Sequence, residues 1–152
     1  MTHRGTLLTT MDAMRSDLER FVANHLDDAD QQIGDGWSLH DVVAHLALWD
    51  RMAVRRIVGT PLPEGDEVAS REPWDLDAFN EEMRLGRATR PMSEVAAEFD
   101  AAWQAVRSAV LTADDDACKP GGTVWTTIDD DSAGHYPQHI PIRDLLAKQS
   151  GS

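Results

Sequence analysis

Residues 38–59, SLHDVVAHLALWDRMAVRRIVG, carry the clearest helical pattern in the chain. Their apolar side chains recur every three or four residues, which is the spacing of one buried helix face. The hydroxyl of Ser38 can cap the first turn, and Asp41 occupies the reciprocal position of a capping box. Gly59 is typical of a helix end. The stretch therefore predicts an amphipathic helix from Ser38 to about Gly59 that packs along its apolar face.

Two further helices with one apolar seam each are predicted on either side of this stretch. Apolar residues follow alternating steps of four and three from Leu7 to Leu26, and a similar stripe runs from Val95 to Val110. A shorter helical arm is expected from about Asp75 to Thr89, and Pro91 should restart the chain. The segment from Gly59 to Trp74, about fifteen residues, is long for a link between helices. It predicts a crossover from one side of a bundle to another.

The C-terminal third is predicted to contain one more helix. The segment VWTTI (124–128) is rich in strand-forming residues, but a lone strand has no partner, so an extended loop is expected. The last helix should begin between Ser132 and His135. Pro137 is tolerable in its first turn, and Pro141 should bend it. The sequence thus predicts an all-α fold over residues 1–152: a single domain and a four-helix bundle with a long crossover between helices 2 and 3.

The composition of the chain limits the cellular environments and the classes of partner that are expected for it. The 152 residues carry 27 acidic and 14 Lys or Arg side chains, a formal net charge of −13, which disfavours contact with nucleic-acid phosphates. No apolar run is long enough to span a membrane, and the first residues lack the order of a signal peptide. Cys118 is the single cysteine, which excludes an internal disulfide and a cysteine-built zinc site. A cytoplasmic protein with a small-molecule substrate, and with neither nucleic acid nor membrane as partner, is expected.

Histidine spacing suggests a metal site. A stripe with steps of four, three and four runs through the last predicted helix: His135, His139, Ile142 and Leu146. Imidazoles at i and i+4 are helix neighbours and can reach one metal ion. A helical wheel places His45 on the buried face of the second helix and His40 on the opposite, polar face. Three inward histidines would leave open positions on a divalent ion, as in catalytic sites. The alternative is that each is a hydrogen-bonded core residue.

Other polar and aromatic residues are better explained by structure than by chemistry. His25 lies at the C-terminal end of the first helix, where a histidine suits the helix dipole. Trp49 and Trp103 are expected in the core. The segment Asn80–Glu82 is expected on the solvated surface. Cys118 has no evident activating cation nearby and is not expected to be a nucleophile.

Four short segments resemble one family. GWSLHDVVAHLALW (36–49) looks like the second helix of the DinB/YfiT-like superfamily, and HYPQHIPIR (135–143) resembles its last helix. Phe79-Asn80 and MSEVAAEF (92–99) are similar to the third-helix region of its ClbS/DfsB-like and mycothiol-dependent maleylpyruvate isomerase-like branches. The resemblance implies a four-helix bundle, often a homodimer, with nickel or zinc held at the positions of His45, His135 and His139. It also implies mycothiol or bacillithiol as co-substrate in some members, and hydrolytic self-resistance in others.

Three hypotheses for function follow. The first is a metal-dependent transferase or hydrolase that acts on a small electrophile or thiol conjugate, with metal-bound water or thiolate as the nucleophile. Detoxification or self-resistance would be its role. The second is a metal-free bundle that binds and sequesters a hydrophobic ligand without catalysis. The third is a structural or dimerising bundle.

Overall fold

The computed structural model describes residues 1–34, 36–59 and 76–149. Most of these residues are helical, which confirms the all-α prediction. The α-helices are α1 (His3–Asn24), α2 (Leu39–Val58), α3 (Leu76–Arg87), α4 (Met92–Leu111), α5 (Thr123–Asp131) and α6 (Leu145–Gln149). Three short 3-10 helices are η1 (Leu26–Asp28), η2 (Asp115–Cys118) and η3 (Ala133–Gln138), and β1 (Gln32–Gly34) pairs antiparallel with β2 (Trp37–Ser38). Among the described helices, none combines the length and the apolar character needed to cross a bilayer.

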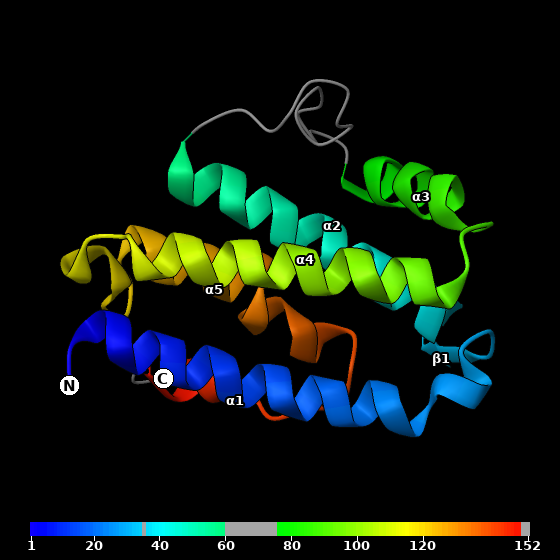
Figure 1. Ribbon diagram of the computed structural model, residues 1–152, viewed down its shortest axis with the longest axis horizontal. Helices are drawn as coiled ribbons and strands as arrows, with labels where there is room; N and C mark the ends of the chain where they lie inside the picture. The colour runs from blue at the N-terminus through cyan, green and yellow to red at the C-terminus, as the bar shows by residue number, and fades with distance from the viewer. Residues whose placement is uncertain (35, 60–75, 150–152) are drawn as a thin grey trace.

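The helices α1, α2, α4 and α5 form a four-helix bundle, in which α5 takes the place of the predicted last helix. Figure 1 shows α1 and α4 running side by side across the molecule, with α2 and α5 behind α4. The central helix is α2, which packs against α4, α5 and α3. The short α3 lies on the far side of α2 from α1. The predicted crossover between helices 2 and 3 falls within residues 60–75, outside the described part of the chain.

The predicted boundaries of α2 are confirmed at both ends. Ser38 Oγ accepts a hydrogen bond from the Asp41 backbone N–H, and the Asp41 carboxylate accepts one from the Ser38 N–H, each at 3.1 Å. Gly59 ends the helix with a left-handed φ of 73°, which glycine adopts without steric cost. Local sequence therefore fixes the helix that carries His45.

Removing this cap should destabilise the protein measurably. We expect Ser38→Ala to lower the free energy of unfolding by about 1 kcal/mol, because the Asp41 backbone N–H in the first turn of α2 loses its Ser38 Oγ acceptor. Urea denaturation followed by circular dichroism measures the change. Ser16→Ala, at an exposed position inside α1, is the matched control and should unfold like the wild type. Equal midpoints for the two variants would contradict the capping role.

Two predictions for the C-terminal third are wrong. VWTTI is not an extended loop but most of α5, because Val124, Trp125 and Ile128 are buried on one side of a helix in the bundle. Packing thus overrides their strand propensity. The predicted last helix is instead η3, an irregular segment and the short α6. Pro137 and Pro141 lack the N–H groups that a continuous α-helix would need there.

A glycine makes the sharp turn from α5 into η3 possible. A Cβ atom at Gly134 would lie 2.4 Å from the backbone oxygen of Asp129, so no larger residue fits without a backbone shift. The chain therefore folds back tightly after α5. This turn places the segment that begins at His135 against the middle of α2.

Candidate metal centre

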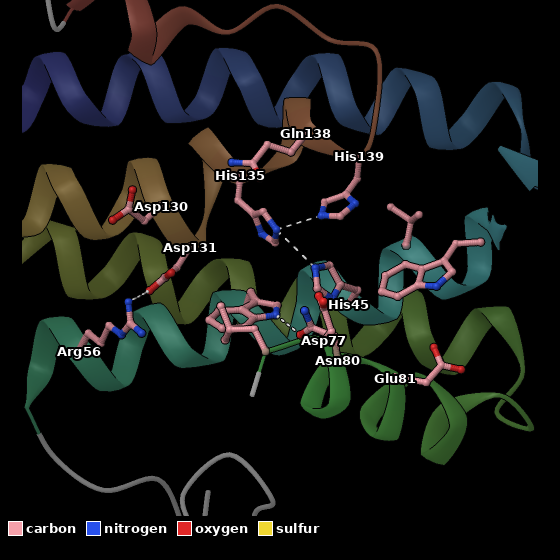
Figure 2. Close-up of a pocket in the computed structure, with 14 residues that line it drawn as sticks. His45, Arg56, Asp77, Asn80, Glu81, Asp130, Asp131, His135, Gln138 and His139 are labelled. Atoms are coloured by element: carbon pink, nitrogen blue, oxygen red, sulfur yellow. Dashed lines mark hydrogen bonds and ion pairs between the residues drawn. The ribbon is translucent and has the colours of Figure 1, made fainter. Parts of the chain in front are cut away.

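Three histidines from two distant parts of the chain meet in one place. His45 comes from α2, His135 from η3, and His139 from the residue that follows η3. The Nε2 atom of His135 lies 3.3 Å from Nε2 of His45 and 3.0 Å from Nε2 of His139. Figure 2 shows the three imidazole rings turned toward one another. Among the described residues, these three histidines are the group whose side chains could hold a metal ion. One ligand nitrogen from each lies within 4.8 Å of the other two.

The geometry fits a transition-metal ion. Two nitrogens bound to one ion at 2.0–2.1 Å lie about 2.9–3.4 Å apart when the angle at the ion is between octahedral and tetrahedral. Both observed nitrogen–nitrogen distances fall in this range. Imidazole is also a donor that suits zinc and nickel. The three histidines could therefore hold a metal ion.

The winding of η3 explains how His135 and His139 come together although no α-helix joins them. The His135 N–H donates to the Ser132 carbonyl at 2.8 Å, and the His139 N–H donates to the Tyr136 carbonyl at 3.0 Å. Pro137 lies inside η3, where its missing N–H is tolerated. The predicted α-helical spacing was thus wrong, yet the two rings still share one face of this segment.

Burial keeps two of the imidazoles neutral. His45 and His135 are only 7% and 8% exposed. Burial, together with the two neighbouring imidazoles, lowers the pKa of His45 to about 2. Burial and His139 lower the pKa of His135 to about 4, while the backbone carbonyl of Asp131 acts in the opposite direction. Near pH 7 both rings therefore keep a free lone pair, which is the form that binds metal.

The lowered pKa of His135 predicts acid sensitivity of the metal-free protein. Between pH 6.5 and about 4 the unfolded chain holds a proton on His135 that the folded chain does not. The free energy of unfolding should therefore fall as pH falls through this window, by up to about 1.4 kcal/mol per pH unit. Urea denaturation at several pH values measures it, with His135→Asn lacking this contribution. The exposed His3→Asn is the control, and identical slopes for wild type and His135→Asn would contradict the prediction.

A buried hydrogen bond joins α2, which carries His45, to η3, which carries His135. The hydroxyl of Tyr136 donates to the Asp50 carboxylate at 2.8 Å, and both residues are fully buried. Asp50 belongs to α2, as does His45, and Tyr136 is the neighbour of His135. Burial raises the pKa of Asp50 to about 7, against the effect of the Tyr136 hydrogen bond and of Arg15. This pair was not predicted from the sequence. Its signal is a carboxylate directly after Trp49 in an apolar stretch.

A pocket of about 800 Å³ opens beside the histidines. Trp37 lies with its ring nearly parallel to that of His139, at an interplanar angle of 6°, and Trp49 forms another wall. The Trp49 Nε1–H donates to the Asn80 side-chain oxygen at 3.0 Å, which ties α3 to α2. Asn80 and Glu81 line the pocket, so the prediction that they are plain surface is wrong, whereas Glu82 is exposed. This volume is typical of sites for small molecules.

The remaining histidines lie outside the cluster. His40 was predicted on a polar face, but it is only 7% exposed, and its Nε2 donates to the Arg90 carbonyl at 2.6 Å. The prediction fails because the segment after α3 covers that face of α2. His25 stacks on Phe21 and contacts the Phe21 carbonyl through Nδ1, so its structural role is confirmed. Trp103 is buried in the core, as predicted.

Comparison with known protein families places this chain in one of them. Comparisons with curated proteins and with solved structures gave no significant match. The family model of the DinB superfamily matches residues 10–130. This match includes α2 with His45 and ends before His135 and His139. It covers most of the chain, and the helical bundle agrees with it. The chain therefore belongs to the DinB superfamily.

Proposed function

We propose that the protein is a metal-dependent enzyme that acts on a small electrophile or a thiol conjugate. The observation that carries the proposal is the convergence of three imidazole nitrogens at the side of a pocket of about 800 Å³. A structural site would be closed by a fourth protein ligand, whereas three ligands leave a position open for water or substrate. The described residues place no fourth histidine, cysteine or carboxylate in this cluster.

The residues of the site have separate tasks in this proposal. His45, His135 and His139 would hold a zinc or nickel ion. Once bound, such an ion acts as a Lewis acid that lowers the pKa of a bound water or thiol. Trp37 and Trp49 shield this side of the pocket from water and orient an apolar substrate.

Asp131 is the candidate for proton transfer. It lines the pocket and forms an ion pair with Arg56, whose Nη1 atom lies 2.7 Å from the Asp131 Oδ2 atom. This ion pair links α5 to α2 (Figure 2). Burial raises its pKa to about 6 although Arg56 acts in the opposite direction. A carboxyl group with this pKa exchanges a proton near neutral pH, as a general acid or base must. Its Oδ atoms can therefore take a proton from water or a thiol and return it to a leaving group.

Two reactions fit these tasks, hydrolysis of an electrophilic substrate and transfer of a small thiol such as mycothiol. Both can be tested on chelator-treated protein reloaded with zinc or nickel. One assay follows hydrolysis of 4-nitrophenyl acetate, and the other follows conjugation of mycothiol to 1-chloro-2,4-dinitrobenzene. We expect the loaded wild type to accelerate at least one reaction, and the metal-free protein and His135→Ala to accelerate neither.

The same assay distinguishes catalysis from sequestration. Equal rates for loaded and metal-free protein, with one ion bound per chain in the loaded form, would contradict the enzyme proposal. Retention of a hydrophobic ligand by the metal-free protein at unchanged affinity would favour the metal-free binding bundle instead.

A further inference from the structure

The pocket beside the histidines has an unbalanced charge. Of the described residues that line it, four carry carboxylates, Asp77, Glu81, Asp130 and Asp131, and one carries a guanidinium, Arg56. Two of the four are compensated within the fold, since Asp131 pairs with Arg56 at 2.7 Å and Glu81 pairs with Arg84. This leaves Asp77 on α3 and Asp130 on α5.

Asp77 and Asp130 are exposed, and within the described ranges neither forms an ion pair. They come from elements on different sides of the pocket, as Figure 2 shows. Two negative charges at an open cavity favour a cation in that cavity and oppose an anion. The chain as a whole, at −13, acts in the same direction.

The cavity, rather than the carboxylates, defines the binding site. His45 and His135 lie on its inner side and are more than nine-tenths buried. The Nε2 atom of each lies within hydrogen-bonding distance of another imidazole nitrogen. Trp37 and Trp49 add flat aromatic surface. Indole rings attract organic cations through their negative faces, most strongly where water is excluded. A pocket with apolar walls and nearby carboxylates is suited to bind an ammonium group that carries alkyl or aryl substituents.

We propose that the pocket takes a small organic cation, with an ammonium group near Asp77 and Asp130 and an aromatic or alkyl body between Trp37 and Trp49. The inference rests on the proposed function in one respect only, namely that the reactive end of the ligand faces the three histidines. The preference for positive charge follows from the pocket itself. It assigns the substrate class: amine-bearing electrophiles or conjugates rather than carboxylates or phosphate esters.

A set of three probes of similar size tests this preference. Benzyltrimethylammonium has no lone pair and cannot bind a metal ion, so its affinity reports the pocket alone; benzyl alcohol and benzoate are the neutral and anionic counterparts. Isothermal titration calorimetry on metal-free protein should give about tenfold tighter binding of the cation than of the alcohol, with benzoate weakest. Rising ionic strength should reduce this difference, because it screens the exposed carboxylates.

The double variant Asp77→Asn/Asp130→Asn should bind benzyltrimethylammonium about three- to tenfold more weakly and benzyl alcohol unchanged. Asp27→Asn/Asp28→Asn is the control, since it removes the same charge from exposed positions in η1 outside the pocket. Equal affinities for cation and alcohol, or equal losses in both double variants, would overturn the inference. Metal binding is measured separately. A protein that prefers the cation but binds no metal would refute the proposed function and leave this inference standing. A protein that binds metal but does not prefer the cation would refute this inference and leave the proposed function standing.

Discussion

Replacing His45, His135 or His139 with alanine should abolish stoichiometric binding of zinc and nickel, with the affinity falling at least about 100-fold in each variant. Loss of a partner that only orients a metal ligand already costs about 10–100-fold, and a ligand itself should cost no less. The three Nε2 atoms are close enough to share one ion, at 3.0 and 3.3 Å from His135 to its two neighbours. Competition titration with a chromogenic chelator measures the affinity.

His25→Ala is the matched control, because it removes a half-buried imidazole that stacks on Phe21 and does not belong to the three-histidine cluster. It should bind metal like the wild type. His40 is less suitable, since its buried hydrogen bond to Arg90 links its loss to folding. Wild-type affinity in any of the three cluster variants would show that the corresponding imidazole is not a ligand.

Tyr136→Phe should lower the free energy of unfolding by about 1–3 kcal/mol, because it leaves the buried Asp50 carboxylate without its hydroxyl donor. It should also weaken metal binding about tenfold. The reason for the second effect is that the Tyr136–Asp50 hydrogen bond joins η3, which carries His135, to the helix that carries His45. Urea denaturation gives the first quantity, and chelator competition on the folded variant gives the second.

A double-mutant cycle with Asp50→Asn separates this contact from unrelated damage. The two single changes remove the same interaction, so their effects on unfolding should fall short of additivity by about 0.5–3 kcal/mol in the double variant. Additive losses would show that Tyr136 and Asp50 contribute independently. Reduced stability with unchanged metal affinity would show that the contact supports the core without positioning His135.

The sequence was sufficient to predict the parts of the fold that depend on local pattern. The seams of α1, α2 and α4, the capping box at Ser38 and the end at Gly59 all follow from the spacing of apolar residues and from turn chemistry. The three histidines were also predicted as a group, although by a spacing argument that assumed an α-helix. The three rings do meet, because the tight winding of η3 brings His135 and His139 to one side as well.

The features that were missed depend on tertiary contacts. The segment VWTTI has strand-forming residues, and only the apolar surface of the bundle makes it helical. His40 appears polar-facing on a helical wheel, but the chain after α3 covers it. The Asp50–Tyr136 contact and the pocket join residues more than 80 positions apart, such as Asp50 with Tyr136 and His45 with His135. No pattern within one helix can indicate such pairs.

X-ray absorption spectroscopy of zinc- or nickel-loaded protein tests the metal centre most directly, because it reports the ligands around the ion itself. We predict one ion per chain with three imidazole nitrogens at about 2.0–2.1 Å and one or more oxygen ligands from solvent. In the His139→Ala variant, any metal ion that is still bound should show two imidazole nitrogens instead of three. A wild-type protein that binds no stoichiometric ion, or whose ion shows an oxygen-only shell, would contradict the three-histidine site.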